Sequence, residues 1–255
     1  MKNSLSSKGW ALVSMVLLSV FFVPPKKKIT VWLIGDSTMS VKETKAYPET
    51  GWGMPFTWFW DSTVKIDNRA MNGRSTRTFI EENRWNPVVD NLQEGDYVLI
   101  QFGHNDEVPA KKSYVPQNKF KTYLINYVTD TRNKKAIPIL ITPVARRKFD
   151  SSGNIQETHA VYAGIVRDVA KEKDVALIDL SEKSKALYQQ LGPEASKYLF
   201  NYLVPGEHPN YPDGKQDDTH FSELGARKIA ELVLSEIKNL HLELADRISK
   251  PVIKN

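Results

Sequence analysis

A serine, a histidine and two aspartates have the types and spacing of an acyl-transfer site. Ser37 directly follows an apolar run at residues 31–34, and His220 stands three residues after Asp217. A serine hydroxyl attacks an ester carbonyl when an imidazole takes its proton and a carboxylate orients the imidazole. We therefore predict Ser37 as the nucleophile, His220 as the base and Asp217 as the orienting carboxylate, with the neighbouring Asp218 as the competing candidate.

Such a site also needs hydrogen-bond donors for the oxyanion of the tetrahedral intermediate. The candidates are the backbone N–H groups of Ser37 and Gly73 and the side-chain amide of Asn105. Each residue has a simpler interpretation, because a serine at a turn often caps a helix and an Asn-Gly pair often forms a tight turn. All of them together at the ends of predicted strands favour the catalytic interpretation.

The other histidines receive no catalytic role. His104 is predicted to pack or to position its neighbours, His159 to lie on the surface of a helix, and His208 has no assignment. Asp217, Asp218 and His220 lack the spacing of a three-ligand metal site. The chain also lacks a phosphate-binding loop and a dinucleotide-binding glycine pattern. We predict no metal and no cofactor.

The elements that must position these residues alternate between strands and helices. Short apolar runs predict strands at residues 29–34, 64–66, 97–102, 137–142 and 175–180, and helical periodicity predicts helices around residues 120–128, 161–169 and 229–240, the last capped by Ser222. This alternation is typical of a three-layer α/β/α domain with a parallel sheet of five strands. Ligands bind such sheets at the carboxyl ends of the strands. The proline-containing stretch 188–219 is predicted to be a surface excursion.

Composition sets limits on the domain and its partners. The 255 residues are 41% hydrophobic and 25% charged, which fits one folded domain, predicted over residues 26–255. The net charge of +5 comes from dispersed residues and indicates no nucleic-acid site. The absence of cysteine excludes disulfides, thiolate catalysis and thiolate-bound zinc. The oligomeric state is not predictable from these features.

The first 23 residues differ from the rest of the chain. Residues 10–23 form an uncharged, mostly apolar run that is shorter than the roughly 20 residues of a membrane-spanning helix. Residues 1–23 are therefore predicted to be a signal peptide, and the protein to be exported to a periplasm or the extracellular space. Because no small-residue cleavage motif precedes Pro24, an uncleaved membrane anchor is the alternative.

The polar segments, in this order, resemble the conserved blocks of the SGNH or GDSL-type hydrolases. Gly35-Asp36-Ser37 resembles the first block, Gly73 the second, residues 103–106 the third, and Asp217 with His220 the last. The resemblance implies a flavodoxin-like sheet, no metal, and the roles assigned above. It also favours Asp217 over Asp218, because the family's carboxylate stands three residues before its histidine.

Five longer segments are similar to rhamnogalacturonan acetylesterases, which remove acetyl esters from the pectin backbone. They are "GDSTM" at 35–39, "GWG" at 51–53, "NGRSTRTF" at 72–79, "GDYVLIQFGHND" at 95–106 and "DDTHFSELGA" at 217–226. The resemblance implies a serine esterase that deacetylates a plant cell-wall polysaccharide through an acetyl-enzyme. Other acetylated sugars such as xylan, acyl transfer to a sugar, and a non-catalytic carbohydrate-binding relative remain alternatives.

Charged and aromatic side chains bear on the substrate. Four arginines are expected near the strand ends, where they would suit an acidic polymer: Arg74, Arg77, Arg146 and Arg147. Trp52, Trp58 and Trp60 are candidates for stacking on sugar rings, with core packing as the alternative for two of them.

Overall fold

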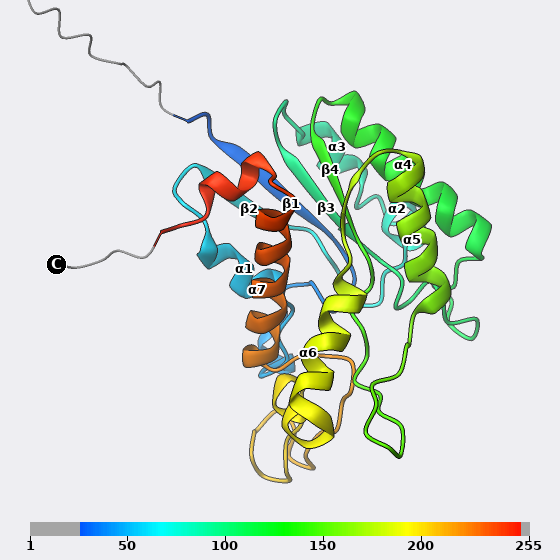
Figure 1. Ribbon diagram of the computed structural model, residues 1–255, viewed down its shortest axis with the longest axis vertical. Coiled ribbons are helices and arrows are strands. Elements are labelled where there is room, and N and C mark those ends of the chain that lie inside the picture. Colours follow the sequence, from blue (N-terminus) through cyan, green and yellow to red (C-terminus); the bar gives the residue numbers. More distant parts are fainter. Residues whose placement is uncertain (1–25, 251–255) are drawn as a thin grey trace, which may run out of the picture.

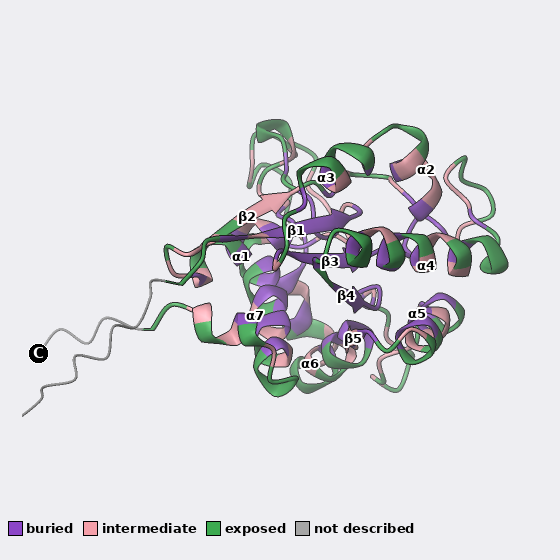
Figure 2. Cartoon of the chain, turned by 90° about the horizontal axis from the view of Figure 1, so that it is seen from above, coloured by how far each residue is buried: buried purple, intermediate pink, exposed green. Residues whose placement is uncertain are grey.

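A parallel sheet of five strands forms the centre of the computed structural model, which describes residues 26–250. The strands are β1 (Ile29–Gly35), β2 (Val64–Asn68), β3 (Tyr97–Gln101), β4 (Ile137–Ile141) and β5 (Ala176–Ile178), in the order β2-β1-β3-β4-β5. The central strands are buried and β2 at one edge is partly exposed (Figure 2). The predicted parallel α/β sheet is confirmed.

Helices cover both faces of the sheet (Figure 1). One face carries α1 (Gly53–Phe56), α6 (Leu180–Ala195) and α7 (Glu223–Asn239), and the other carries α2 (Thr76–Glu81), α3 (Asn86–Asn91), α4 (Gln117–Asn133) and α5 (Ala160–Glu172). Alternate residues of β1 enter the two cores: Val31 and Leu33 pack toward α7, whereas Trp32 and Ile34 pack toward α4. Short 3-10 helices lie at Thr44–Ala46, Thr57–Phe59, Ser196–Leu199 and Glu243–Arg247.

Most predicted elements match, and the differences have local causes. The fifth strand ends at Ile178, because Asp179 caps α6 by accepting a hydrogen bond from the Glu182 backbone. The predicted surface excursion is partly wrong: residues 188–195 belong to α6, and the Tyr188 side chain is fully buried. Ser222 caps α7 as predicted, accepting from Gly225 N–H at 3.2 Å.

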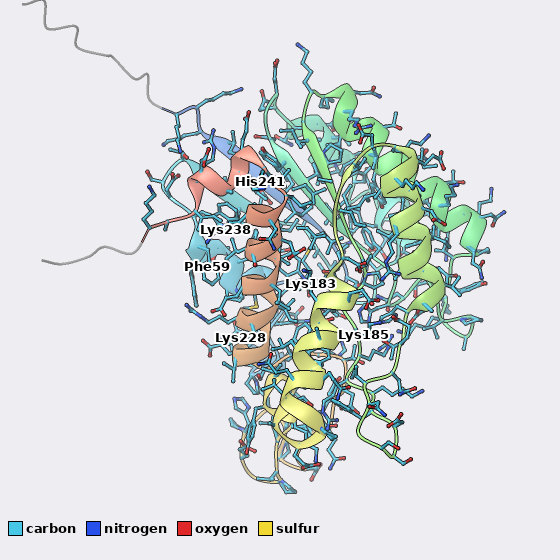
Figure 3. The ribbon with its side chains drawn as sticks, viewed as in Figure 1. Phe59, Lys183, Lys185, Lys228, Lys238 and His241 are labelled. Atoms are coloured by element: carbon cyan, nitrogen blue, oxygen red, sulfur yellow. The ribbon has the colours of Figure 1, made fainter. Side chains whose placement is uncertain are left out.

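Several lysines lie on the surface of α6 and α7, among them Lys183, Lys185, Lys228 and Lys238 (Figure 3). Lys183 on α6 lies 3.0 Å from Glu236 on α7, and Lys228 lies 2.8 Å from Glu231. Positive charge on this face is therefore dispersed, as the sequence predicts. Among residues 26–250, no helix is long and apolar enough to cross a membrane. The predicted leader at residues 1–23 lies outside the described residues.

Candidate active site

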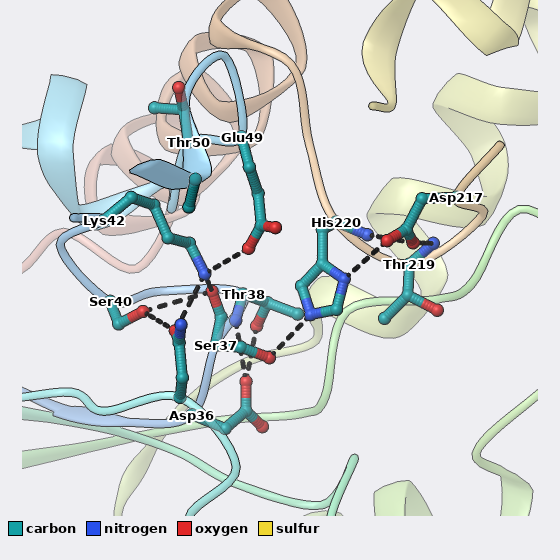
Figure 4. A network of polar contacts seen from close by, with 12 residues as sticks. Asp36, Ser37, Thr38, Ser40, Lys42, Glu49, Thr50, Asp217, Thr219 and His220 are labelled. Carbon is teal, nitrogen blue, oxygen red and sulfur yellow. Dashed lines mark hydrogen bonds and ion pairs between the residues drawn. The ribbon is translucent and has the colours of Figure 1, made fainter. Parts of the chain in front are cut away.

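Ser37, His220 and Asp217 form a hydrogen-bonded row at the carboxyl end of the sheet (Figure 4). Ser37 follows β1, and its Oγ lies 3.0 Å from His220 Nε2. His220 Nδ1 lies 2.9 Å from Asp217 Oδ2. Because an ionised carboxylate only accepts hydrogen bonds, Nδ1 carries the ring proton and Nε2 is left to accept the serine proton. This geometry is that of a nucleophile, a base and an orienting acid.

The segment from Asp217 to His220 folds into a tight turn around the Asp217 carboxylate. Its Oδ1 accepts the N–H groups of Thr219 at 2.8 Å and His220 at 3.0 Å. Burial favours the neutral acid, but the His220 ring and these N–H groups outweigh it and hold the pKa of Asp217 well below its ordinary value. Asp217 is therefore charged at neutral pH and can stabilise an imidazolium.

Asp218, the competing candidate, points elsewhere. Its Oδ1 accepts from Arg147 Nη1 at 2.6 Å and from the Tyr202 hydroxyl at 2.6 Å. The backbone N–H of Arg147 also donates to the Asp218 carbonyl at 2.8 Å. Asp218 thus anchors the turn, and of the two aspartates it is Asp217 that is hydrogen-bonded to the His220 ring.

A buried relay of hydrogen bonds fixes the turn that carries Ser37. Trp52 Nε1 donates to Gln101 Oε1 at 2.7 Å, and Gln101 Nε2 donates to Thr38 Oγ1 at 2.7 Å. The Thr38 hydroxyl and backbone N–H both donate to Asp36 Oδ1, at 2.9 and 3.0 Å. These side chains are 0–1% exposed, so the turn is locked against the core on both sides of Ser37.

The three expected oxyanion donors surround the same space. Lys111 Nζ donates to Asn105 Oδ1 at 3.0 Å, so the Asn105 amide nitrogen faces away from it and donates to the Arg74 carbonyl at 3.0 Å. One amide hydrogen of Asn105 remains for a ligand. The N–H groups of Ser37 and Gly73 have no acceptor within residues 26–250. Gly73 has φ of +77°, a conformation that favours glycine.

A pocket of about 310 Å³ joins these groups. Its lining contains the base and all three expected oxyanion residues, one of which is the nucleophile, and it adds three side chains to which the sequence pattern assigns no role. The lining residues are Ser37, Glu49, Asn72, Gly73, Asn105, Lys111 and His220. A small ester group fits here beside the Ser37 hydroxyl.

Two of the predicted rim arginines support the catalytic turn from behind. Arg146 Nη1 donates to Thr219 Oγ1 at 2.8 Å. Arg147 is 9% exposed, pairs with Asp218 and lies 5.3 Å from the Tyr202 ring centroid. The other two arginines form surface pairs, Arg74 with Glu82 and Arg77 with Glu81. Arg146 and Arg147 are thus engaged with the protein itself.

The prediction for His159 is wrong, whereas that for His104 is confirmed. His159 is 1% exposed, because it precedes α5 and packs against His104 and Glu107, with its Nδ1 2.8 Å from Glu107 Oε1. The His104 and His159 ring centroids are 4.3 Å apart. Burial, followed by the neighbouring positive groups, lowers the pKa of His104 well below its ordinary value. His208 lines a separate pocket with Tyr47 and Trp58.

Two of the three candidate stacking tryptophans pack in the core, as the alternative interpretation predicts, and the third is exposed. Trp52 and Trp60 are 0% and 8% exposed and pack against Phe56. Trp58 is 67% exposed and lines the pocket with Tyr47 and Met54. Among the described residues, no three His, Asp or Glu side chains cluster in a way that would hold a metal ion.

Comparisons with known proteins agree with this geometry. The family model described as the GDSL-like lipase/acylhydrolase family matches residues 33–228. The rhamnogalacturonan acetylesterase RhgT of Bacillus subtilis is 44% identical over 223 residues, covering 88% of this chain and 95% of that protein. A probable rhamnogalacturonan acetylesterase of the same organism, YesY, is 35% identical over 86% of this chain and 97% of its own length.

A solved structure has the same fold. The crystal structure of the protein YxiM from Bacillus subtilis superposes with a TM-score of 0.73 at 26% identity, over 86% of this chain and 58% of that chain. The family match covers both the Ser37 turn and the Asp217–His220 turn. This chain belongs to the GDSL-like lipase/acylhydrolase family.

Proposed function

We propose that this protein is a serine esterase that removes acetyl groups from rhamnogalacturonan. The observation that carries the proposal is the row from Ser37 Oγ through His220 to Asp217, with spacings of 3.0 and 2.9 Å, beside the free amide hydrogen of Asn105. RhgT and YesY match this chain over 95% and 97% of their own length. The first is named a rhamnogalacturonan acetylesterase and the second a probable one, and these names support rhamnogalacturonan as the substrate.

In the first half-reaction, His220 Nε2 takes the proton of Ser37 as Oγ attacks the acetyl carbonyl carbon. Asp217 stabilises the imidazolium through its hydrogen bond to Nδ1. The negative charge on the carbonyl oxygen is met by the N–H groups of Ser37 and Gly73 and by the Asn105 amide. His220 then protonates the departing sugar oxygen, which leaves an acetyl group on Ser37.

In the second half-reaction, water replaces the sugar. His220 takes a proton from the water, which attacks the acetyl-enzyme carbonyl, and the same donors bind the oxyanion. Collapse of the intermediate releases acetate, and the proton returns from His220 to Ser37 Oγ. The pocket that holds these groups is open to solvent on the side of the exposed Asn72 and Gly73.

The charge beside the pocket suits an acidic polymer. A second pocket shares Gly73 and Lys111 with the catalytic pocket. Its other charged residues are Lys112 and the paired Arg74 and Glu82, so cations outnumber acids in its lining. The galacturonate units of the substrate carry carboxylates, and cationic side chains of this kind attract them. We propose that the polymer extends from the catalytic pocket toward this basic side.

Export is part of the same proposal. A polysaccharide outside the cell is accessible only to an enzyme that leaves the cytoplasm, and residues 1–23 have the composition of a signal peptide. Attachment to a membrane is proposed only for the case in which this segment is retained.

The test is acetate release from acetylated rhamnogalacturonan, acetylated xylan and a short aryl acetate, by the unaltered protein and by Ser37→Ala. We expect release from the pectic polymer that is lost in the variant. Acetate release from xylan and the aryl acetate but not from the pectic polymer would overturn the proposed substrate. Release that persists in Ser37→Ala would overturn the proposed mechanism.

A further inference from the structure

Lys42 is a buried cation five residues after the nucleophile (Figure 4). Its side chain is 0% exposed, and its ammonium nitrogen lies 2.5 Å from the Ser37 carbonyl oxygen, 2.9 Å from Asn72 Oδ1 and 2.7 Å from Glu49 Oε1. Burial lowers the pKa of Lys42, and the Glu49 carboxylate opposes that shift. A buried charge is tolerated when acceptors surround it, as they do here. The ammonium therefore connects three segments at one point.

This ammonium sets the orientation of the Asn72 side chain. An ammonium only donates, so the atom of Asn72 that faces it is the amide oxygen. The Ser40 hydroxyl donates to the same oxygen at 2.5 Å. The amide nitrogen is therefore free of Lys42 and Ser40, and the exposed Asn72 lines the catalytic pocket. Within residues 26–250 this nitrogen donates to no acceptor.

Glu49 presents the complementary group. One carboxylate oxygen, Oε1, is held by Lys42, while Oε2 receives no hydrogen bond from the described residues. The side chain is 14% exposed and lines the same pocket as Ser37 and His220. The pocket thus offers an oriented donor from Asn72 and an oriented acceptor from Glu49, and neither belongs to the catalytic row.

We propose that Asn72 and Glu49 bind hydroxyl groups of the sugar ring that bears the acetyl ester, and that Lys42 is the positioning residue that holds both. A sugar hydroxyl donates one hydrogen bond and accepts others, so neighbouring hydroxyls can satisfy the Glu49 oxygen and the Asn72 amide together. The pair selects sugar esters over simple esters, while Ser37, His220 and Asn105 act on both. The proposal rests on the esterase function proposed above.

The test compares an acetylated polysaccharide that the unaltered protein hydrolyses with an aryl acetate, which has no sugar hydroxyls. Asn72→Ala removes the donor, and Asn72→Asp removes it while keeping an oxygen for Lys42 and Ser40. We expect both variants to lose about tenfold in kcat/KM on the polysaccharide, mainly through KM, because loss of one hydrogen bond worth about 1.4 kcal/mol is a tenfold effect. On the aryl acetate we expect less than a threefold change.

Two further variants complete the design. Lys42→Met should lose more on the polysaccharide than on the aryl acetate, and Asn91→Ala, an exposed asparagine on α3, should change neither. An equal loss on both substrates, or an Asn72→Asp variant that matches the unaltered protein on the polysaccharide, would overturn the proposal. Failure of the esterase function would show differently, as an unaltered protein without turnover.

Discussion

The nucleophile and the base of this site are held in different ways. Ser37 stands on a turn that continues β1 and is tied to the core by the fully buried Asp36, Thr38 and Gln101. His220 stands on a turn that is supported by the cations Arg146 and Arg147, after β4, and that is followed by the fully buried Phe221. We call residues 35–42 with 101–106 the nucleophile side, and residues 217–220 with 146–147 the histidine side. The side chains that support the first are buried in the core, whereas the second is held by polar contacts and, beyond His220, by the buried Phe221.

The pKa values of Asp36 and Asp106 on the nucleophile side and of Asp217 on the histidine side are shifted in opposite directions. On the nucleophile side, burial raises the pKa of Asp36, and it raises the pKa of Asp106 to about 7 against the lowering effect of the Thr76 donors. On the histidine side, the contacts of Asp217 outweigh its burial and lower its pKa. Burial in the core thus raises the pKa of both acids on the nucleophile side, whereas the acid that must stabilise an imidazolium stays charged.

The largest expected effect tests whether the two sides act as one unit. Ser37→Ala and His220→Ala should each lower kcat on an aryl acetate by about 10⁴-fold or more, and the double variant should lose no more than either one. The reason is that proton transfer and attack are a single event. Initial rates with circular dichroism as a folding check provide the measurement. Losses that multiply in the double variant would show that the two residues act independently.

The next effect concerns the oxyanion. Asn105→Ala should lower kcat by roughly 10²- to 10³-fold with little change in KM, because the donor is needed most in the transition state. Asn118→Ala, at an exposed asparagine of α4, is the matched control and should have normal turnover. Asn105→Ala with normal turnover would remove Asn105 from the oxyanion site.

The third effect is a pH dependence of the free energy of unfolding that comes from Asp106 on the nucleophile side. Folded Asp106 keeps its proton up to about pH 7, whereas in the unfolded chain it ionises near its ordinary value of 3.8. The folded state therefore binds more protons between these values, and this stabilisation is lost as pH rises through 7.

Asp106→Asn removes that titration but keeps an acceptor for the N–H and hydroxyl of Thr76, which donate at 2.8 and 2.6 Å. At each pH, the variant is compared with the unaltered protein, and the difference between their free energies of unfolding is taken. This destabilisation should be about 2 to 3 kcal/mol larger at pH 5 than at pH 8, because only the unaltered protein is stabilised by the proton on Asp106. Urea unfolding at both pH values measures this. A difference that does not vary with pH would show that Asp106 is ionised in the folded protein at pH 5.

The contrast between the two sides also explains what the sequence could predict. Ser37 and Asp217 with His220 are local patterns, and apolar runs located the strands whose ends bring them together. The supports are non-local: Gln101 contacts Thr38 and Arg147 contacts Asp218 across 63 and 71 residues. Residue type and periodicity carry no signal for such partners.

The burial of His159 and Lys42 was also beyond what the sequence could predict. Helical periodicity placed His159 on a surface, but the residue precedes the helix and turns inward to Glu107. A lysine in a polar loop is expected in solvent, and only the positions of Glu49 and Asn72 in the fold make burial of Lys42 favourable. The signal that could have found Lys42 was its place just after the Gly-Asp-Ser-Thr turn.

The smallest expected effect separates the two kinds of support. Arg147→Met should keep the stacking volume against Tyr202 but remove the guanidinium contacts to Asp218 and to the Pro193 carbonyl. Because Asp218 anchors the turn of His220, we expect about a tenfold loss in kcat and about 1 to 2 kcal/mol in free energy of unfolding. Arg227→Met, at an exposed surface pair on α7, should change neither. If Arg147→Met loses stability but keeps its full kcat, the position of His220 does not depend on the Arg147–Asp218 contact, and the cation supports the fold but not the catalytic geometry.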